Sequence, residues 1–152
     1  MTFYIEQSEV FKKNQKNKKL WHAFIQMIIF ILTFVISRKY FNNVYVFEWT
    51  SHRYYLYIWL GVLILTHLDK KYISYAITLA NVIGLFIGQY LGDYIQSINM
   101  AKITNNTDAE NVYRLSTHYG VFIWIFCIVL AILIAIMIGF INRYKKTKEI
   151  KL

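Results

Sequence analysis

The chain contains no proline, one cysteine and six glycines among its 152 residues. Without proline, no helix can be kinked by that residue. A single cysteine, Cys127, excludes an intramolecular disulfide and the dithiol chemistry of paired cysteines. Acidic residues are also few, 8 against 17 lysines and arginines, so the net charge is +9. The chain therefore has neither a disulfide framework nor a proline kink to define its shape.

Enzyme motifs are missing as well. The sequence contains no G-x-S-x-G, no H-E-x-x-H and no Walker loop. Its apolar stretches hold no clustered pair of carboxylates, since Asp69 and Asp93 stand at the ends of such stretches. We therefore predict a protein that is not an enzyme, with no catalytic residue, no cofactor and no metal site.

Apolar sequence is what the chain has in abundance, with 57% hydrophobic residues. Four runs stand out, at residues 20–37, 54–68, 72–92 and 119–141. A membrane-spanning helix needs about 20 apolar residues, and snorkelling side chains at its ends help a short run to cross. We predict an all-α integral membrane four-helix bundle over residues 20–142, with a basic, amphipathic segment before it (1–19) and a basic tail after it (143–152). Two or three spans are the alternative.

Basic residues predict the orientation of these spans. Twelve of the 17 lie before the first run, between the second and third, or after the fourth. The positive-inside rule then places both termini in the cytoplasm, which an even number of spans satisfies. The same residues would meet anionic lipid headgroups, so the charge implies no nucleic acid. We expect a multi-pass protein of the plasma membrane, and the abundance of Ile, Asn, Lys and Tyr suggests a bacterial inner membrane.

The connecting segments carry further predictions. Two heptad-spaced pairs of apolar residues within 3–11 indicate a short interfacial helix, with a frayed tail as the alternative. The aromatic segment 38–53 is predicted to be an outer loop at the level of the headgroups. The turn HLDKKY (67–72) is so short that the second and third spans would form a tight antiparallel hairpin.

A helical hairpin is predicted to project outside between the third and fourth spans. Leu91, Ile95 and Ile98 continue the helical spacing of the third span, and the tip is expected at residues 105–106. Residues 107–110, Thr-Asp-Ala-Glu, match a capping box in which Thr107 caps a new helix. Apolar spacing at 112, 115 and 119 predicts that this helix continues into the fourth span.

Small residues recur every fourth position in the third and fourth spans. The third carries Ala76, Ala80, Gly84, Gly88 and Gly92, and the fourth carries Cys127, Ala131, Ala135 and Gly139. Small residues let membrane helices approach closely, which favours association where apolar burial gains nothing over lipid. A hairpin folded about residues 105–106 would pair Gly84 with Cys127, Ala80 with Ala131 and Ala76 with Ala135. We predict that these stripes pack against each other, with an oligomer contact or a narrow pathway as the alternative.

Four polar residues beside this stripe are the candidate site for a ligand, an ion or a proton: Asn81, Gln89, Asp93 and His118. The same fold places Asp93 level with His118, and a carboxylate beside a histidine is a proton-responsive pair. With His52 added, the pair would be an outward-facing metal site. A second alternative is haem held by histidines at the two membrane faces, His22 with His67 or His52 with His118.

Two classes of function fit this sequence. The first is an accessory, immunity or assembly partner that binds another membrane component through the outer hairpin. The second is a homo-oligomeric channel or the subunit of a small-solute or ion transporter, which would use the polar face of the third span. A pore would need several copies because one span supplies all of that face. We expect a protein partner or further copies of the chain in either case.

Overall fold

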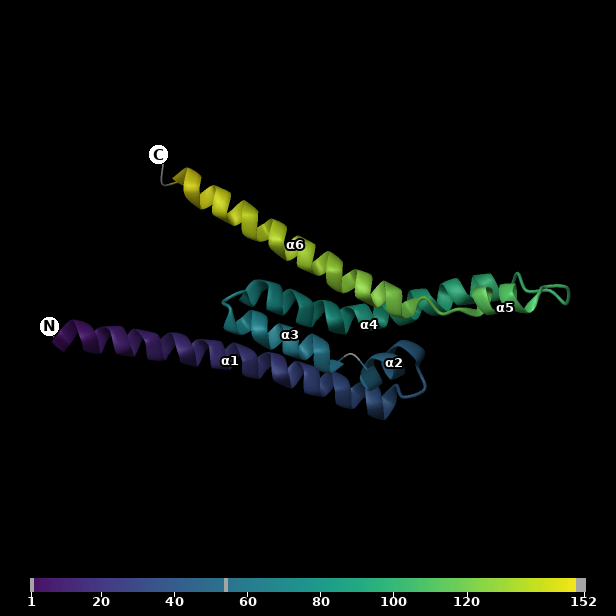
Figure 1. Cartoon of the computed structure of the whole chain (residues 1–152), viewed down its shortest axis with the longest axis horizontal. Helices are drawn as coiled ribbons and strands as arrows, with labels where there is room; N and C mark the ends of the chain where they lie inside the picture. The colour runs from purple at the N-terminus through teal and green to yellow at the C-terminus, as the bar shows by residue number, and fades with distance from the viewer. Residues whose placement is uncertain (1, 54, 150–152) are drawn as a thin grey trace.

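The computed structural model describes residues 2–53 and 55–149, and the side chains of residues 14–53 and 55–144. This part of the chain folds into helices without a strand: α1 (Thr2–Tyr40), α2 (Tyr45–Arg53), α3 (Tyr55–His67), α4 (Lys71–Met100), α5 (Ala109–Ser116) and α6 (Gly120–Glu149). The all-α prediction is therefore confirmed. The beginning of α1, the end of α6 and the α3–α4 turn lie at one end of the bundle, here called the termini end (Figure 1). The opposite end, where α2 and the α4–α5 hairpin lie, is the hairpin end.

Three helices are long and apolar enough to cross a membrane among the described residues. They comprise Asn14–Tyr40 of α1, all of α4, and Gly120–Tyr144 of α6. The helix α3 has 13 residues, which is about 20 Å at 1.5 Å per residue and shorter than a hydrocarbon core of about 30 Å. These three helices indicate a membrane protein, while the count of four spans stays a prediction.

The first helix is longer than predicted. It runs unbroken through 39 residues, so neither a separate interfacial helix nor a frayed tail precedes the first apolar run. No glycine or proline lies between Thr2 and Tyr40 to end it. The helix stops before the pair Asn42–Asn43, where Val44 N donates to Phe41 O in a turn. Asparagine favours such turns because its side chain competes for backbone hydrogen bonds.

The aromatic segment 38–53 is not a surface loop. Most of it forms α2, which contacts α1, α3, α4 and α6. Val46 and Phe47 of α2 are 0% and 3% exposed. The Phe47 ring lies 4.7 Å from that of Phe41 and 5.2 Å from that of Phe86. The aromatic side chains expected among headgroups thus supply a core that joins the helices at the hairpin end.

The helix α4 is the centre of the bundle. Of its most apolar stretch 44% is buried, against 17% for α1 and 11% for α6. It follows α3 through the short turn Leu68–Lys70, in which Asp69 has a positive φ of 60°, a conformation that aspartate tolerates better than most residues. The predicted tight hairpin between the second and third apolar runs is therefore present.

Glycines bring α4 against the beginning of α6. A Cβ on Gly84 would lie 3.1 Å from Cys127 Cβ, as the predicted pairing of these residues requires. A Cβ on Gly88 would lie 2.5 Å from the backbone oxygen of Gly120, and one on Gly92 would lie 2.8 Å from Gly120 Cα. The contacts at Gly88 and Gly92 leave no room for a side chain, so these two positions need glycine, whereas a Cβ at Gly84 needs a shift of only a few tenths of an ångström.

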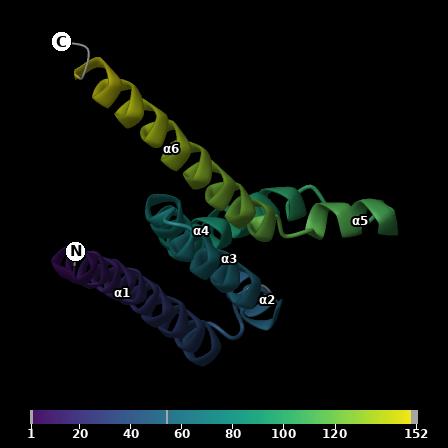
Figure 2. The same ribbon diagram turned by 60° about the vertical axis from the view of Figure 1, so that its left-hand side comes forward.

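The predicted packing does not continue to the termini end. No atom of the described residues lies within 4 Å of a Cβ built on Gly139, and α6 diverges from α4 there (Figures 1 and 2). An open cavity of about 520 Å³ separates Tyr72 and Ile73 from Ala135 and Gly139. Small residues permit close contact in lipid without enforcing it, because apolar faces gain no burial from each other.

The α4–α5 hairpin differs in detail from its prediction. Helical spacing through Ile98 is confirmed, and residues 105–106 form the turn at the tip. The N-cap of α5 is Asp108, whose Oδ1 accepts from Asn111 N at 2.7 Å, and not Thr107, whose Oγ1 accepts from Thr104 N. Asp108 has the extended backbone that an N-cap requires. The prediction that this helix continues into the fourth apolar run was also wrong, because α5 ends at Ser116 and α6 begins at Gly120.

The contact of Gly84 with Cys127 predicts a disulfide in the variant Gly84→Cys. Their Cβ positions are 3.1 Å apart, and a small relaxation reaches the usual Cβ–Cβ distance of about 3.5–4.5 Å. Mild oxidation should give an intramolecular bond, seen as faster migration on a non-reducing gel and reversed by dithiothreitol. The control is Ile83→Cys, because Ile83 is 55% exposed on another face of α4. Equal bond formation in both variants would contradict the register.

Alanine at Gly88 and at Gly139 should change stability in opposite directions. At Gly88 the added methyl meets backbone that no rotamer change can relieve, and such overpacking costs about 1–3 kcal/mol. At Gly139 the methyl meets open space, and the helix propensity of alanine contributes up to about 1 kcal/mol. Unfolding of each variant in detergent measures the difference. A stabilised Gly88→Ala variant would show that α4 and α6 are not in contact there.

Candidate functional site

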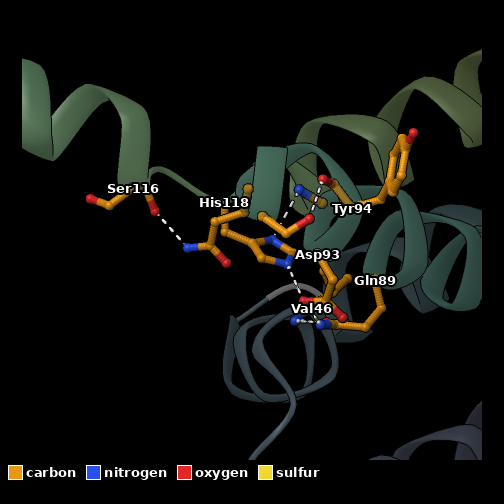
Figure 3. Close-up of polar contacts among 9 residues, drawn as sticks. Val46, Gln89, Asp93, Tyr94, Ser116 and His118 are labelled. Atoms are coloured by element: carbon orange, nitrogen blue, oxygen red, sulfur yellow. Dashed lines mark hydrogen bonds and ion pairs between the residues drawn. The ribbon is translucent and has the colours of Figure 1, made fainter. Parts of the chain in front are cut away.

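A cluster of polar groups joins α2, α4 and the start of α6 at the hairpin end (Figure 3). Asp93 Oδ1 accepts from Gln89 Nε2 at 2.8 Å and from His118 Nε2 at 3.0 Å. Gln89 Oε1 accepts from Val46 N at 2.8 Å, at the beginning of α2. We call Gln89, Asp93 and His118 the Asp93 cluster. It contains three of the four candidate residues, and the predicted pairing of Asp93 with His118 is present.

The hydrogen bonds of His118 define its tautomer. The backbone N–H of Gly120 donates to Nδ1 at 3.1 Å, so Nδ1 carries a lone pair. The proton of a neutral ring is then on Nε2, from which it is donated to Asp93. A second proton, on Nδ1, would face the N–H of Gly120 and break that bond. The geometry therefore fits a neutral imidazole with both nitrogens satisfied.

The imidazole of His118 occupies space that a side chain at Gly92 or Gly120 would fill. His118 is 8% exposed, and its Cε1 is the nearest atom to a Cβ built on Gly92. The same Cε1 also crowds a Cβ built on Gly120. Tyr45 covers the ring at a centroid distance of 4.5 Å. Gly92 was predicted as a helix-packing residue, and the structure adds that it accommodates His118.

An open cavity of about 510 Å³ adjoins the cluster. It is lined by residues 43–45 where α2 begins, by the polar residues of α4, and by Ser116 and His118 at and after the end of α5. One wall is tied together by Gln96, whose Nε2 donates to Ser116 O at 2.6 Å. Asp93 is reachable from this cavity because its side chain is 60% exposed, whereas His118 is buried behind it.

Asn81 does not belong to the Asp93 cluster. It lies 1% exposed between α4 and α6, where its Oδ1 accepts from Trp124 Nε1 at 3.2 Å. Twelve residues along a helix separate it from Asp93, which corresponds to about 18 Å. The structure therefore separates Asn81 from the other three candidates, and gives it the role of a contact between helices.

The described side chains do not form the metal site considered as an alternative, while haem stays an alternative that these contacts do not test. Among the described residues, no three His, Cys, Asp or Glu side chains gather as metal ligands. His52 Nδ1 is instead 2.8 Å from Glu48 O within α2. His22 Nδ1 is 2.9 Å from the Tyr75 hydroxyl, while His67 is exposed at the end of α3.

A second polar cluster, near the termini end, is absent from the sequence predictions. Gln26 of α1, Thr66 of α3 and Ser74 of α4 are 0%, 3% and 0% exposed. Gln26 Oε1 accepts from Thr66 Oγ1 and from Ser74 Oγ, both at 2.8 Å. Polar residues within apolar runs face protein or water rather than lipid. That rule, applied to Gln26 in the first run, could have found the cluster.

Comparison of the chain with family models, with curated proteins and with solved structures finds no match. No residue role is therefore transferred from another protein.

The Asp93 cluster predicts different outcomes for two substitutions of Asp93. In Asp93→Asn, Oδ1 can still accept from Gln89 and His118, so stability should stay near that of the wild type. In Asp93→Leu, the buried Nε2–H of His118 loses its acceptor. A lost partner of this kind costs about 1–3 kcal/mol, and water from the open cavity favours the lower value. Thermal unfolding in detergent, with ¹⁵N spectra of the His118 ring, measures both effects.

The two variants also test the charge state of His118. A neutral ring needs an acceptor at Asp93 and no negative charge, and the Nε2–H tautomer should persist in Asp93→Asn. Equal destabilisation by asparagine and leucine would contradict the neutral ring, because it would show that the carboxylate charge holds a protonated imidazole.

Proposed function

We propose that the protein is a non-catalytic, multi-pass protein of the plasma membrane that acts as an accessory, immunity or assembly partner of another membrane component. It would bind this component through the α4–α5 hairpin. The observation that carries the proposal is a set of large apolar side chains exposed on the hairpin. Their exposed fractions are 59% for Tyr94, 44% for Ile98, 50% for Met100 and 78% for Tyr113.

In the proposed topology, these side chains would lie beyond the hydrocarbon core of the membrane. The 30 residues of α4 measure about 45 Å, which exceeds a hydrocarbon core of about 30 Å. The residues of α4 after Gly92 include the polar Asp93, Gln96 and Asn99. We therefore expect the part of α4 that exceeds the hydrocarbon core to lie at the hairpin end. Apolar surface that is exposed to water, outside a membrane, is typical of a site for another protein. The helix α5 adds to this surface and has no buried residue among its eight.

The polar residues of α4 favour a partner protein over a single-chain pore. Asn81 bonds to Trp124, Gln89 to Val46, and Asp93 to His118. Each is engaged by a neighbouring segment of the same chain, and Asn81 is separated from the other two. Such residues hold helices in register and do not form a continuous polar path for an ion.

The path of the chain supports four crossings with both termini inside. In Figure 1, α1 and α4 run from the termini end towards the hairpin end, whereas α3 and α6 run back. A chain that enters the hydrocarbon region with α1 and α4 in the same direction must return between them, and α3 is the segment that returns. The lysines of the α3–α4 turn then lie at the same end as the basic tails, as the positive-inside rule requires.

A homo-oligomeric channel or transporter subunit is the second candidate function. It is favoured by the open face between α4 and α6 at the termini end, where Gly139 is exposed and Ala135 lines an open cavity. Small residues on an open face allow a helix of another copy to approach closely. In that arrangement the pathway would lie between copies.

Photo-crosslinking from membranes distinguishes the two candidates. A benzoylphenylalanine at Tyr113 or Ile98 should form one discrete adduct with a different protein, because both positions face the proposed partner. Ile98→Asp should abolish the adduct from position 113 while leaving thermal stability unchanged. The control position is Phe126, which is 64% exposed on the apolar part of α6 and should label lipid.

The opposite pattern would contradict the partner function. Adducts of twice the mass of the chain from a crosslinker at Ala135, with no adduct from the hairpin, would indicate contact between copies. The homo-oligomeric function would then replace the first proposal.

A further inference from the structure

A cavity of about 410 Å³ opens at the termini end between α1 and the α3–α4 turn. Its volume lies in the range of about 300–1,000 Å³ that is usual for small-molecule sites. Residues from two separated parts of the chain line it, residues 14–22 of α1 and residues 66–71 around the α3–α4 turn; they include Asn14, Gln15, Lys18, Lys19, Asp69 and Lys71. Neither the Asp93 cluster nor the hairpin contributes to it.

The charge of this cavity is positive. Lys19 Nζ is neutralised by Asp69 Oδ2 at 2.6 Å and also donates to His67 O at 3.3 Å. Lys18 and Lys71 have no carboxylate within ion-pair distance among the described side chains, and Lys71 Nζ lies over the Tyr72 ring at 5.7 Å. Two ammonium groups therefore remain without a counter-charge, beside the amide groups of Asn14 and Gln15. This chemistry suits an anion with several acceptor oxygens.

The beginning of α4 adds to the attraction for an anion. Lys71 is its first residue, and Lys70 at the N-cap makes no side-chain hydrogen bond to the helix. The first backbone N–H groups of a helix have no partner within it, and its dipole is positive there. An anion held by Lys71 would thus also meet unpaired backbone donors.

The position of the cavity along the helices indicates where its ligand comes from. Lys18 and Lys19 come directly before the apolar run that begins at Leu20, and Lys71 comes directly after the α3–α4 turn. Trp21 and Tyr72 are 62% and 78% exposed at the same level, as is typical of side chains at a membrane surface. The cavity therefore lies at the depth of lipid headgroups.

We propose that this cavity binds the phosphate of an anionic phospholipid headgroup, with Lys18 and Lys71 as its charged ligands. Asp69 contributes indirectly, because its ion pair with Lys19 connects α1 to the α3–α4 turn and so shapes the cavity. A bound headgroup would hold these two segments together from the membrane surface. The site goes beyond the proposed function and does not depend on a partner at the hairpin.

Native mass spectrometry of the full chain in mild detergent tests the site. We expect phosphatidylglycerol to bind at least tenfold more tightly than phosphatidylcholine. The double variant Lys18→Gln/Lys71→Gln should lose about 10- to 30-fold in affinity for phosphatidylglycerol, as two lysines at an anionic surface imply. The matched control is Lys39→Gln/Lys102→Gln, which removes the same charge at the hairpin end. Lys39 is a close counterpart of Lys71 because its Nζ also lies over an adjacent tyrosine ring at 5.5 Å.

Three results would overturn the proposal. Equal losses in the two double variants would show that net charge attracts lipid without a site. Equal binding of the two lipids to the wild type would show that the anionic headgroup is not recognised. Displacement of phosphatidylglycerol by millimolar inorganic phosphate would assign the cavity to a free anion.

The folding of the variants is checked separately. All four substituted lysines are exposed, so we expect unchanged thermal stability in both double variants, which would confirm that they fold. The hairpin adducts report separately on the proposed function.

Discussion

The contact between the backbones of Gly88 and Gly120 is the constraint on which the hairpin end depends. The two helices meet so closely there that the carbonyl oxygen of one glycine takes the space of the other's missing side chain. This approach places the N–H of Gly120 beside His118, and His118 beside Asp93. It also places Val46 of α2 against Gly120. A helix interface, a buried histidine and the attachment of α2 thus follow from two residues without side chains.

Polar groups define the arrangement at both ends of the bundle. In lipid, apolar faces gain little from each other, so register depends on close packing and on hydrogen bonds. The hydrogen bonds of the Asp93 cluster join α2 and the beginning of α6 to α4. The hydrogen bonds among Gln26, Thr66 and Ser74 join α1 and α3 to α4. The helix α4 takes part in both, which explains why it is the most buried of the long helices. The two clusters lie far apart along α4, so they do not form one continuous polar pathway through the described part of the bundle.

The ends differ in how completely they are closed. At the hairpin end, aromatic side chains from α2, from α4 and from the connection between α1 and α2 pack between the helices. Large apolar side chains stay exposed on the hairpin. At the termini end, α6 departs from α4, and basic side chains line an open cavity. The closed hairpin end and the more open, positively charged termini end fit the proposed protein, which would present one surface to a partner and the other to lipid.

The sequence by itself determined the helical class, the long apolar runs, the tip of the hairpin and the pairing of Gly84 with Cys127 and of Asp93 with His118. These features depend on local composition and on a period of four residues, which a hairpin converts directly into contacts. Only the tertiary structure decided that residues 45–53 form a helix with one face packed into the bundle, because their aromatic side chains suit an interface and a core equally well. It also decided that Gly139 stays open, that Asp108 and not Thr107 caps α5, and that Gln26 meets Thr66 and Ser74. Each of these outcomes depends on which helix lies opposite and at what angle, and a periodicity within one helix does not contain that information.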